Sequence, residues 1–306
     1  MAAAMSLGGG IYAALITPFD SVGRVDVVSL DRLVDFYLEH GVHGLVVGSL
    51  IGEALVLTED ERAELVRRVV ARVGERAPVL AGVCDRTDRE ACRTARHAAD
   101  IGVQGLVVTP PQVAASSGEQ LVRSLKQLWS AASVPLVLLD YPALTGITLD
   151  VALLSRLVGE IDGIRGVKLE DAPTPPKIAQ LREAVGLRLR IYGASGGRHC
   201  LAELANGADG LMTGYAFPEQ LVEIHDRFRE GDTRGAAVVY QRCLPVIELE
   251  AQSGAVIAAR KEILRLRGVI THAGVRAPTF QLDAAARSTL LNTLESLQQE
   301  LIAPSR

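Results

Sequence analysis

The chain has 306 residues, of which 48% are hydrophobic and 22% are charged, and its formal net charge is −4. This composition supports a sizeable buried core, argues against intrinsic disorder, and gives no sign of a nucleic-acid partner. No apolar run is long enough to span a membrane, and the segment Met1–Gly10 lacks the basic and apolar regions of a signal peptide. We therefore expect a cytoplasmic protein with neither a nucleic-acid nor a membrane partner.

The cysteines and histidines show no spacing typical of metal or redox sites. The cysteines, which form no CxxC pair, are Cys84, Cys92, Cys200 and Cys243. The six histidines are dispersed, and none belongs to an HExxH pattern. We predict reduced thiols, no metal and no cofactor.

A short glycine motif recurs along the chain and marks its internal repeat. The four copies are Gly41–Leu45, Gly102–Leu106, Gly163–Val167 and Gly207–Leu211. In each copy a helical pattern ends at the first glycine, which suits a left-handed C-cap, and an apolar run starts at the second. The motif therefore predicts repeated β-α units with a parallel sheet.

Eight apolar runs are strand candidates, taken in chain order. They begin near Ile11, Gly44, Pro78, Gly105, Pro135, Gly163, Leu189 and Gly210. Amphipathic stretches separate them, among them Leu30–Glu39, Glu59–Val73, Arg89–Ile101 and Glu119–Ala131. Eight β-α units in about 230 residues predict a TIM (β/α)8 barrel. A doubly wound sheet is disfavoured, since no GxGxxG follows the first strand.

The chain divides into three segments without a clear linker. Residues 1–10 are expected to be a flexible lead-in, and residues 11–231 the barrel. Residues 232–306 are expected to form a C-terminal helical region, with a helical pattern throughout Asp232 to Leu301. No Pro-, Gly- or Ser-rich stretch separates this region, so we expect it to share one structural domain with the barrel.

Lys168 stands out because lysine is rare, accounting for four of the 32 basic residues. The other three, which lie in polar helical patterns, are Lys126, Lys177 and Lys261. Lys168 instead ends the apolar run that starts at Gly163, and barrel enzymes carry catalytic groups at strand ends. Burial favours the neutral amine, which is a nucleophile. The alternative is an ion pair with Glu170 or Asp171.

Five short motifs follow one another over most of the chain. They are Ile16–Asp20, Gly52-Glu53 with Leu57–Arg62, Val108–Pro111, Pro142 with Thr145-Gly146, and Gly166–Lys168. In this order they resemble the dihydrodipicolinate synthase/N-acetylneuraminate lyase family. The resemblance implies a homo-oligomeric barrel, a dimer or a tetramer. It also implies that Lys168 forms a Schiff base with a 2-oxo acid such as pyruvate.

Two loops are expected to bind the substrate. The resemblance places the substrate carboxylate on Leu50, Ile51 and Gly52, where backbone amides serve whatever the side chains. The glycine-rich segment after the seventh strand, with Gly193 and Ser195, opens a helix and is suited to an anionic or hydroxylated tail. A simple turn is the alternative for this second segment.

Several positions depart from the family pattern. The hydroxylated pair before Gly-Glu is replaced here by Leu50 and Ile51. A proton-relaying tyrosine of the fifth strand is replaced by Leu139, a carboxylate-binding arginine by Leu144, and a loop tyrosine by Gln112. Ordinary dihydrodipicolinate synthase chemistry is therefore not expected.

Glu170 and Tyr141 are the candidates for the missing acid–base function. Glu170 lies two residues after Lys168, so both side chains of an extended strand point to one face. The Lys-x-Glu pattern with Asp140-Tyr141-Pro142 resembles the branch that dehydrates 2-keto-3-deoxy sugar acids. The alternatives are a salt-bridge or solvated role for Glu170, and packing of Tyr141 under Pro142.

These residues predict a Schiff-base-forming lyase acting on a 2-oxo acid. Dehydration of a 2-keto-3-deoxy sugar acid is favoured over retro-aldol cleavage. The first alternative is a dihydrodipicolinate synthase-like or pyruvate-dependent aldolase that condenses pyruvate with an aldehyde. The second is a non-catalytic barrel that binds an oxo acid, which the apolar Leu50, Ile51, Leu139 and Leu144 would suit.

Overall fold

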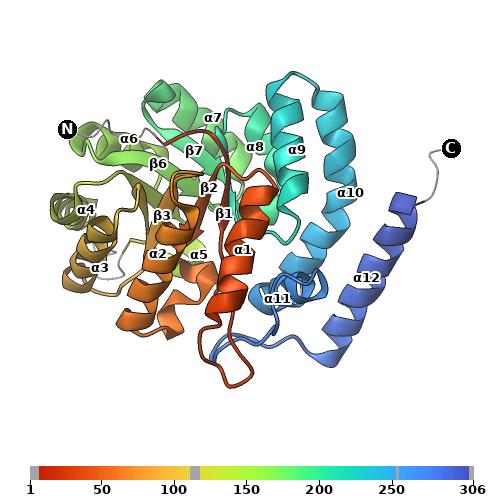
Figure 1. The fold of residues 1–306 in the computed structure, drawn as a ribbon. Helices are drawn as coiled ribbons and strands as arrows, with labels where there is room; N and C mark the ends of the chain where they lie inside the picture. Colours follow the sequence, from red (N-terminus) through yellow and green to blue (C-terminus); the bar gives the residue numbers. More distant parts are fainter. Residues whose placement is uncertain (1–6, 111–117, 253–254, 303–306) are drawn as a thin grey trace.

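The structure is a computed structural model that describes residues 7–110, 118–252 and 255–302. Within these residues, eight parallel strands close a barrel in chain order (Figure 1). They are β1 (Gly10–Ala14), β2 (Gly44–Val47), β3 (Val79–Val83), β4 (Gly105–Val108), β5 (Leu136–Asp140), β6 (Ile164–Leu169), β7 (Arg190–Gly193) and β8 (Gly210–Thr213). Each begins within one residue of its predicted start, and the TIM barrel is confirmed.

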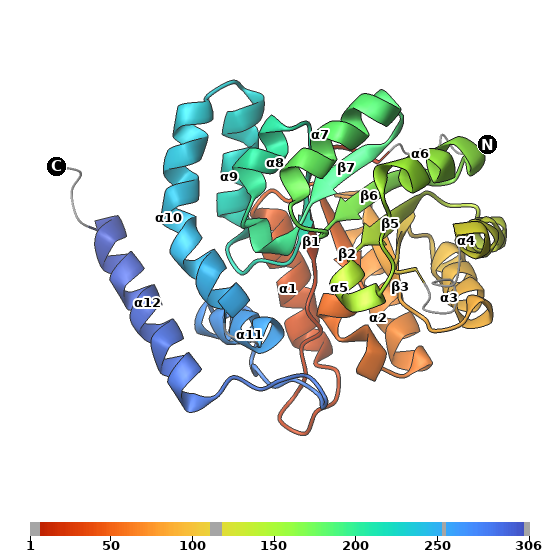
Figure 2. The ribbon, with the colours of Figure 1, turned by 180° about the vertical axis from the view of Figure 1, so that it is seen from behind.

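Helices alternate with the strands and surround the barrel (Figures 1 and 2). They are α1 (Val27–Glu39), α2 (Glu59–Val73), α3 (Asp88–Ile101), α4 (Gly118–Ala132), α5 (Pro142–Thr145), α6 (Val151–Glu160), α7 (Thr174–Val185), α8 (Cys200–Ala205) and α9 (Pro218–Arg229). Short 3-10 turns are η1 (Leu50–Gly52), η2 (Ala54–Val56), η4 (Gly186–Arg188) and η5 (Ser195–Gly197). The helix starts are well specified locally: α2, for example, begins with a capping box between Thr58 and Glu61.

The second glycine of the repeated motif makes room inside the barrel. A Cβ on Gly44 would stand 2.4 Å from the ring of Tyr12, and a Cβ on Gly210 would stand 2.0 Å from the Gly10 carbonyl oxygen. Tyr12 packs edge-on against Tyr192, with ring centroids 5.3 Å apart. Two tyrosine rings thus fill part of the amino-terminal end of the barrel, and the glycines that open β2 and β8 make room for the close packing there.

The first glycine of the motif behaves as predicted in three copies. Gly41, Gly102 and Gly207 have φ values of 75°, 100° and 98°. Gly163 does not have a positive φ, and the predicted left-handed cap is wrong there. Position 163 is glycine for a packing reason, because a Cβ there would stand 2.1 Å from the Trp129 ring.

Beyond the barrel lie α10 (Thr233–Gln252), α11 (Val256–Leu266) and α12 (Ala284–Ile302). In Figures 1 and 2, α10 packs beside α9, and α12 lies outside α10. The predicted boundary at residues 231 and 232 falls between α9 and α10. The expectation of helix throughout this region is wrong, since residues 267–283 form a non-helical connection. No helix in the described ranges is long and apolar enough to cross a membrane.

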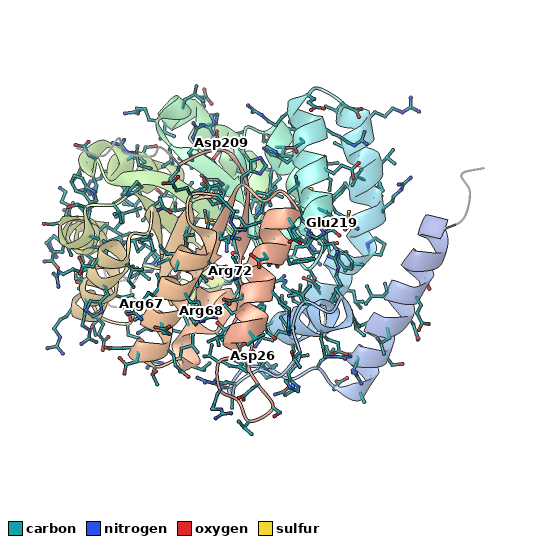
Figure 3. All side chains as sticks on the ribbon, viewed as in Figure 1. Asp26, Arg67, Arg68, Arg72, Asp209 and Glu219 are labelled. Atoms are coloured by element: carbon teal, nitrogen blue, oxygen red, sulfur yellow. The ribbon has the colours of Figure 1, made fainter. Side chains whose placement is uncertain are left out.

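Charged side chains cover the outer helices and link neighbouring ones (Figure 3). Arg68 of α2 pairs with Asp31 of α1 at 2.6 Å, and Arg72 pairs with Asp35. Asp26 caps α1 by accepting from the amides of Val28 and Ser29. Many arginines therefore occupy solvated helix faces.

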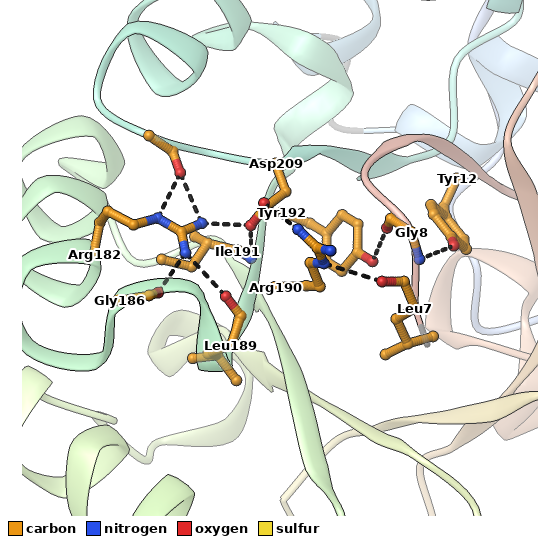
Figure 4. A network of polar contacts seen from close by, with 11 residues as sticks. Leu7, Gly8, Tyr12, Arg182, Gly186, Leu189, Arg190, Ile191, Tyr192 and Asp209 are labelled. Carbon is orange, nitrogen blue, oxygen red and sulfur yellow. Dashed lines mark hydrogen bonds and ion pairs between the residues drawn. The ribbon is translucent and has the colours of Figure 1, made fainter. Parts of the chain in front are cut away.

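Residues 7–10 close the amino-terminal end of the barrel (Figure 4). Leu7 is 4% exposed, and its carbonyl accepts from Arg190 Nε at 3.0 Å. Gly8 accepts from the Tyr192 hydroxyl at 2.6 Å, and Gly10 already belongs to β1. The expected flexible lead-in is therefore wrong for residues 7–10, because packing anchors them. Residues 1–6 lie outside the described ranges.

Asp209 organises the strand starts at the same end (Figure 4). It pairs with Arg182 and, at 2.9 Å, with Arg190, and it accepts from the Ile191 amide at 2.8 Å. These bonds tie α7 and β7 to the turn before β8. The opposite, carboxyl-terminal end of the strands is where barrel enzymes place their chemistry.

Candidate active site

Lys168 lies near the carboxyl-terminal end of β6 and points into the barrel. In the sheet it is in register with Leu139 on one side and Tyr192 on the other. Tyr192 belongs to the cluster of side chains that fills the barrel interior. Residues in register on parallel strands share a face, so Lys168 also faces the interior. Its side chain is 15% exposed, which leaves the amine within reach of a ligand.

Glu170 meets Lys168, and the two side chains form the ion pair that was expected as the alternative to a neutral amine. Nζ of Lys168 and Oε1 of Glu170 are 2.8 Å apart. The amide of Glu170 donates to the Asp140 carbonyl at 2.8 Å, which fixes the backbone beyond β6. Asp171 pairs with Lys177 at 2.7 Å. A carboxylate in hydrogen-bond contact with an ammonium group is placed to accept its proton.

Tyr141 lies on the same side of the site. It is half-buried, and burial raises the pKa of its hydroxyl, an effect to which the nearby charge of Glu170 adds. Its neighbour Asp140 is fully buried and pairs with Lys177 at 2.6 Å. The charge of Glu170 thus acts on Tyr141, whereas Asp140 holds the loop through Lys177.

The apolar replacements take up different places. Leu139 is 4% exposed and stands next to Lys168 across the sheet. Leu144 is 46% exposed on α5. Gln112 lies outside the described residues. Leu139 is therefore the replacement that the sheet register places beside the amine.

The predicted carboxylate loop forms the 3-10 turn η1 after β2. Ile51 packs against the barrel interior cluster, and the Gly52 carbonyl accepts from the Thr17 hydroxyl at 2.6 Å. The first amides of a helical turn have no acceptor within it. The amides of Leu50 and Ile51 hold these positions, whereas the amide of Gly52, the third residue predicted to bind the carboxylate, donates to the Ser49 carbonyl at 2.9 Å.

Glu53, directly after this loop, anchors it through a buried ion pair that the sequence did not indicate. Its carboxylate pairs with Lys261 of α11 and accepts from the Arg276 amide at 2.9 Å. Glu53 has a left-handed φ of 59°. Lys261 is 0% exposed, so its assignment to a polar helical pattern was wrong. Burial lowers the pKa of Lys261 to about 8, opposed by Glu53.

The second predicted binding segment, after β7, forms a turn. Ser195 has a φ of 52°, and the Gly196 amide donates to the Thr213 hydroxyl at 2.9 Å. The segment forms η5, and α8 starts only at Cys200. The expectation that this segment opens a helix directly is therefore wrong. Gly193 is buried, and a side chain there would collide with Glu203, a site residue that the sequence analysis missed.

One cluster of possible metal ligands occurs among the described residues, formed by His43, His225 and Asp226. Nδ1 of His43 accepts from the Ile11 amide at 3.1 Å, so Nε2 of a neutral ring carries the proton. Nδ1 of His225 lies 2.9 Å from Asp226. With His43 in this tautomer, the cluster offers no metal site.

The comparisons with known proteins agree with this geometry. The chain matches the model of the dihydrodipicolinate synthetase family over residues 8–297. It is 30% identical to the L-2-keto-3-deoxyarabonate dehydratase of Azospirillum brasilense, over 92% of each chain. It is 31% identical to a 4-hydroxy-tetrahydrodipicolinate synthase of a Synechococcus strain, over 95% of this chain and 96% of the relative.

Solved structures of the same family are also similar to this chain. Dihydrodipicolinate synthase from Rhodopseudomonas palustris superposes with a TM-score of 0.88 at 32% identity, over 95% of this chain and 99% of that one. A prophage protein of this family from E. coli K12, solved with pyruvate, has a TM-score of 0.89 at 26% identity, over 96% and 99%.

These matches define a lyase, of either the dehydratase or the aldolase type. The chain belongs to the dihydrodipicolinate synthetase family.

Proposed function

We propose that the protein is a Schiff-base-forming lyase that dehydrates a 2-keto-3-deoxy sugar acid. The observation that carries the proposal is the 2.8 Å contact between Lys168 Nζ and Glu170 Oε1 inside the barrel, with Tyr141 nearby. The similarity to the A. brasilense dehydratase supports the substrate class. The pyruvate complex of the E. coli relative supports a 2-oxo acid ligand.

In the first half of the proposed reaction, Glu170 accepts a proton from the Lys168 ammonium group. The neutral amine attacks the C2 carbonyl of the substrate and forms a carbinolamine. Glu170 returns the proton to the carbinolamine hydroxyl, which leaves as water. A protonated imine on Lys168 and an ionised Glu170 result.

In the second half, the imine withdraws electrons from C3. Glu170 removes a C3 proton and gives an enamine, then donates that proton to the C4 hydroxyl, which leaves as water. Water hydrolyses the conjugated imine, restores the Lys168 ammonium and releases an unsaturated 2-oxo acid. One carboxyl group thus carries the proton in each direction, with Tyr141 as an auxiliary proton carrier.

Leu139 favours dehydration over retro-aldol cleavage. Cleavage requires a base on the C4 hydroxyl, and the residue in register with Lys168 is an apolar leucine. Elimination needs only a base at C3 and an acid at the leaving hydroxyl, both of which Glu170 supplies. In this scheme the backbone amides of Leu50 and Ile51 hold the substrate carboxylate, and Gly52 closes the turn by donating its amide to the Ser49 carbonyl at 2.9 Å. The Gly193–Ser195 segment contacts the sugar tail.

A cytoplasmic location and a homo-oligomer, a dimer or a tetramer, remain part of the proposal. Light scattering of the purified protein at several concentrations measures the oligomer directly. A monomer at all concentrations would contradict this part while leaving the chemistry untouched.

The first experiment traps the imine. The protein is incubated with pyruvate and sodium borohydride, and the modified residue is mapped by mass spectrometry. We expect a pyruvate-derived mass gain on Lys168, loss of that gain in Lys168→Met, and its retention in the control Lys126→Met, whose side chain is half-exposed on α4. The absence of an adduct on Lys168 would overturn the Schiff-base mechanism and favour an oxo-acid-binding barrel.

The second experiment separates the reactions. A panel of 2-keto-3-deoxy acids is supplied, and the products are identified by mass spectrometry. A dehydrated oxo acid supports the proposal, whereas released pyruvate identifies an aldolase. Glu170→Gln should lower kcat by about 100-fold or more. Borohydride should still trap its imine on long incubation, because water can replace Glu170 in the slow proton transfers of imine formation but not as the base at C3. Full activity in that variant would remove Glu170 from the mechanism.

A further inference from the structure

Glu203 is a buried carboxylic acid behind the proposed site. It lies on α8 and is 0% exposed. Its Oε1 accepts from the Thr174 hydroxyl at 2.6 Å. Its Oε2 has no hydrogen-bond partner of normal geometry among the described residues. The Thr174 hydroxyl thus donates its hydrogen bond of normal geometry, and the Ala194 amide lies near enough to favour the charged form.

Glu203 connects the two chain segments that carry the proposed chemistry. Thr174 opens α7, four residues after Glu170. On the other side, a Cβ on Gly193 would stand 1.9 Å from Oε2, so a side chain at the end of β7 would force the buried Glu203 carboxyl group to move. The Glu203 carboxyl group therefore spans from the segment after Glu170 to the proposed tail-binding segment.

The surroundings of Glu203 favour the neutral acid. Within the described part of the chain, no lysine or arginine pairs with it. Burial raises the pKa of Glu203 to about 7; the Thr174 hydroxyl and the Ala194 amide oppose this shift, and the charge of Glu170 adds to it. Two further titratable groups face it, Cys200 on α8 and Tyr240 on α10, and burial raises the pKa of each, that of Tyr240 to about 12.

We propose that Glu203 is a positioning residue for the proposed dehydration, which in its neutral form holds the segments after β6 and β7 together and so keeps Glu170 in place. Ionised Glu203 would be a buried charge without a cation partner in the described part of the chain, so it would draw in water or turn away and release the two segments. Ionisation of Glu203 therefore lowers the rate. This inference rests on the proposed function, because Glu170 is the proton carrier in both.

The test compares pH profiles of kcat and KM between pH 5.5 and 9 for the full-length wild type and Glu203→Gln. Glutamine keeps the size and the acceptor for Thr174 but does not ionise. We expect the wild-type kcat to fall by about threefold or more between pH 6 and pH 8.5, and this fall to be absent in the variant. Identical normalised profiles of kcat would overturn the proposal.

A second variant keeps the test valid if Glu203→Gln folds poorly. Thr174→Val removes the hydroxyl that stabilises ionised Glu203, so the decrease in kcat should move to higher pH. An unmoved profile would contradict the link between the two residues. The control is Glu160→Gln, at an exposed carboxylate whose pKa is held low by Lys126 and Arg156, and its profile should match the wild type.

Borohydride trapping of Lys168 in the same samples separates the two possible failures. No adduct in the wild type overturns the proposed function. An adduct and a dehydrated product, together with a pH profile that Glu203→Gln leaves unchanged, overturn only the role of Glu203.

Discussion

Two of the lysines illustrate what a local pattern conveys about single residues. Lys168 was identified from an apolar strand that ends in a basic residue, and the structure places it in the barrel beside Glu170. Lys261 was missed, although it is more completely buried. Its partner Glu53 is 208 residues away in the chain, and α11 has polar residues on a face that other elements cover. The burial of Lys261 therefore depends on Glu53, and the residues next to Lys261 in the sequence do not reveal it.

At the residue scale, Glu203 should make stability depend on pH. Its pKa rises from 4.5 to about 7 on folding, so between these values the folded state holds a proton that the unfolded state has lost. The free energy of unfolding therefore falls as pH rises through this window, by about 3 kcal/mol in total, and this loss is complete above pH 7.

Urea unfolding of wild type and Glu203→Gln at pH 5, 6, 7 and 8 measures this effect. The free energy of unfolding of the variant should fall less as pH rises, because glutamine does not ionise. From pH 5 to pH 8 the variant should therefore become more stable relative to the wild type. Other groups titrate equally in both proteins. A constant difference from pH 5 to pH 8 would contradict the buried, neutral Glu203.

At the scale of elements, β7 and α8 fit together only because position 193 is glycine. Gly193→Ala would place its Cβ 1.9 Å from Glu203 Oε2. We expect the free energy of unfolding to fall by about 1–3 kcal/mol, as in other overpacked cores, together with a loss of kcat. Denaturant unfolding and steady-state kinetics measure the two effects.

A matched glycine provides the control for this substitution. Gly159 lies within α6, and a Cβ there would meet no atom within 4 Å. Gly159→Ala should therefore stabilise the protein by about 0.5–1 kcal/mol. In a double-mutant cycle, Gly193→Ala and Glu203→Ala should be strongly non-additive, since each change affects the same space. Additive effects would show that the collision is relieved elsewhere.

The repeated glycine motif shows how much of the secondary structure can be predicted from the sequence. It marks four of the strands, and the apolar runs placed all eight, because apolar runs and helix ends are local properties. The sequence did not show why each position is a glycine. Gly41, Gly102 and Gly207 adopt a positive φ, whereas a side chain at Gly163 would collide with the Trp129 ring of another element. The same residue type meets a backbone requirement in one place and a packing requirement in another.

At the scale of the whole molecule, the C-terminal region supports the proposed carboxylate loop. Lys261→Met should leave the Glu53 carboxylate buried without its cation, and we expect a loss of about 3–5 kcal/mol in the free energy of unfolding. The control Lys126→Met breaks an exposed ion pair with Glu160 and should change stability little. Thermal and urea unfolding of both variants provide the comparison.

The same variant should also affect substrate binding, because Glu53 directly follows η1. We expect an increased KM for the 2-oxo acid in Lys261→Met under conditions where the protein is still folded, with no change in Lys126→Met. Equal KM values in the two variants would indicate that the ion pair supports the fold without ordering the loop.

The sequence by itself determined the barrel, the strand order and the candidate pair of Lys168 and Glu170. These depend on apolar runs, on glycines at helix ends and on side-chain alternation along one strand, all of which span a few residues. Only the tertiary structure decided the burial of Lys261 with Glu53, the anchoring of residues 7–10, and the place of Glu203 against Gly193. Each of these brings together groups from distant parts of the chain, and their charges and contacts depend on how the closed barrel packs against its helices.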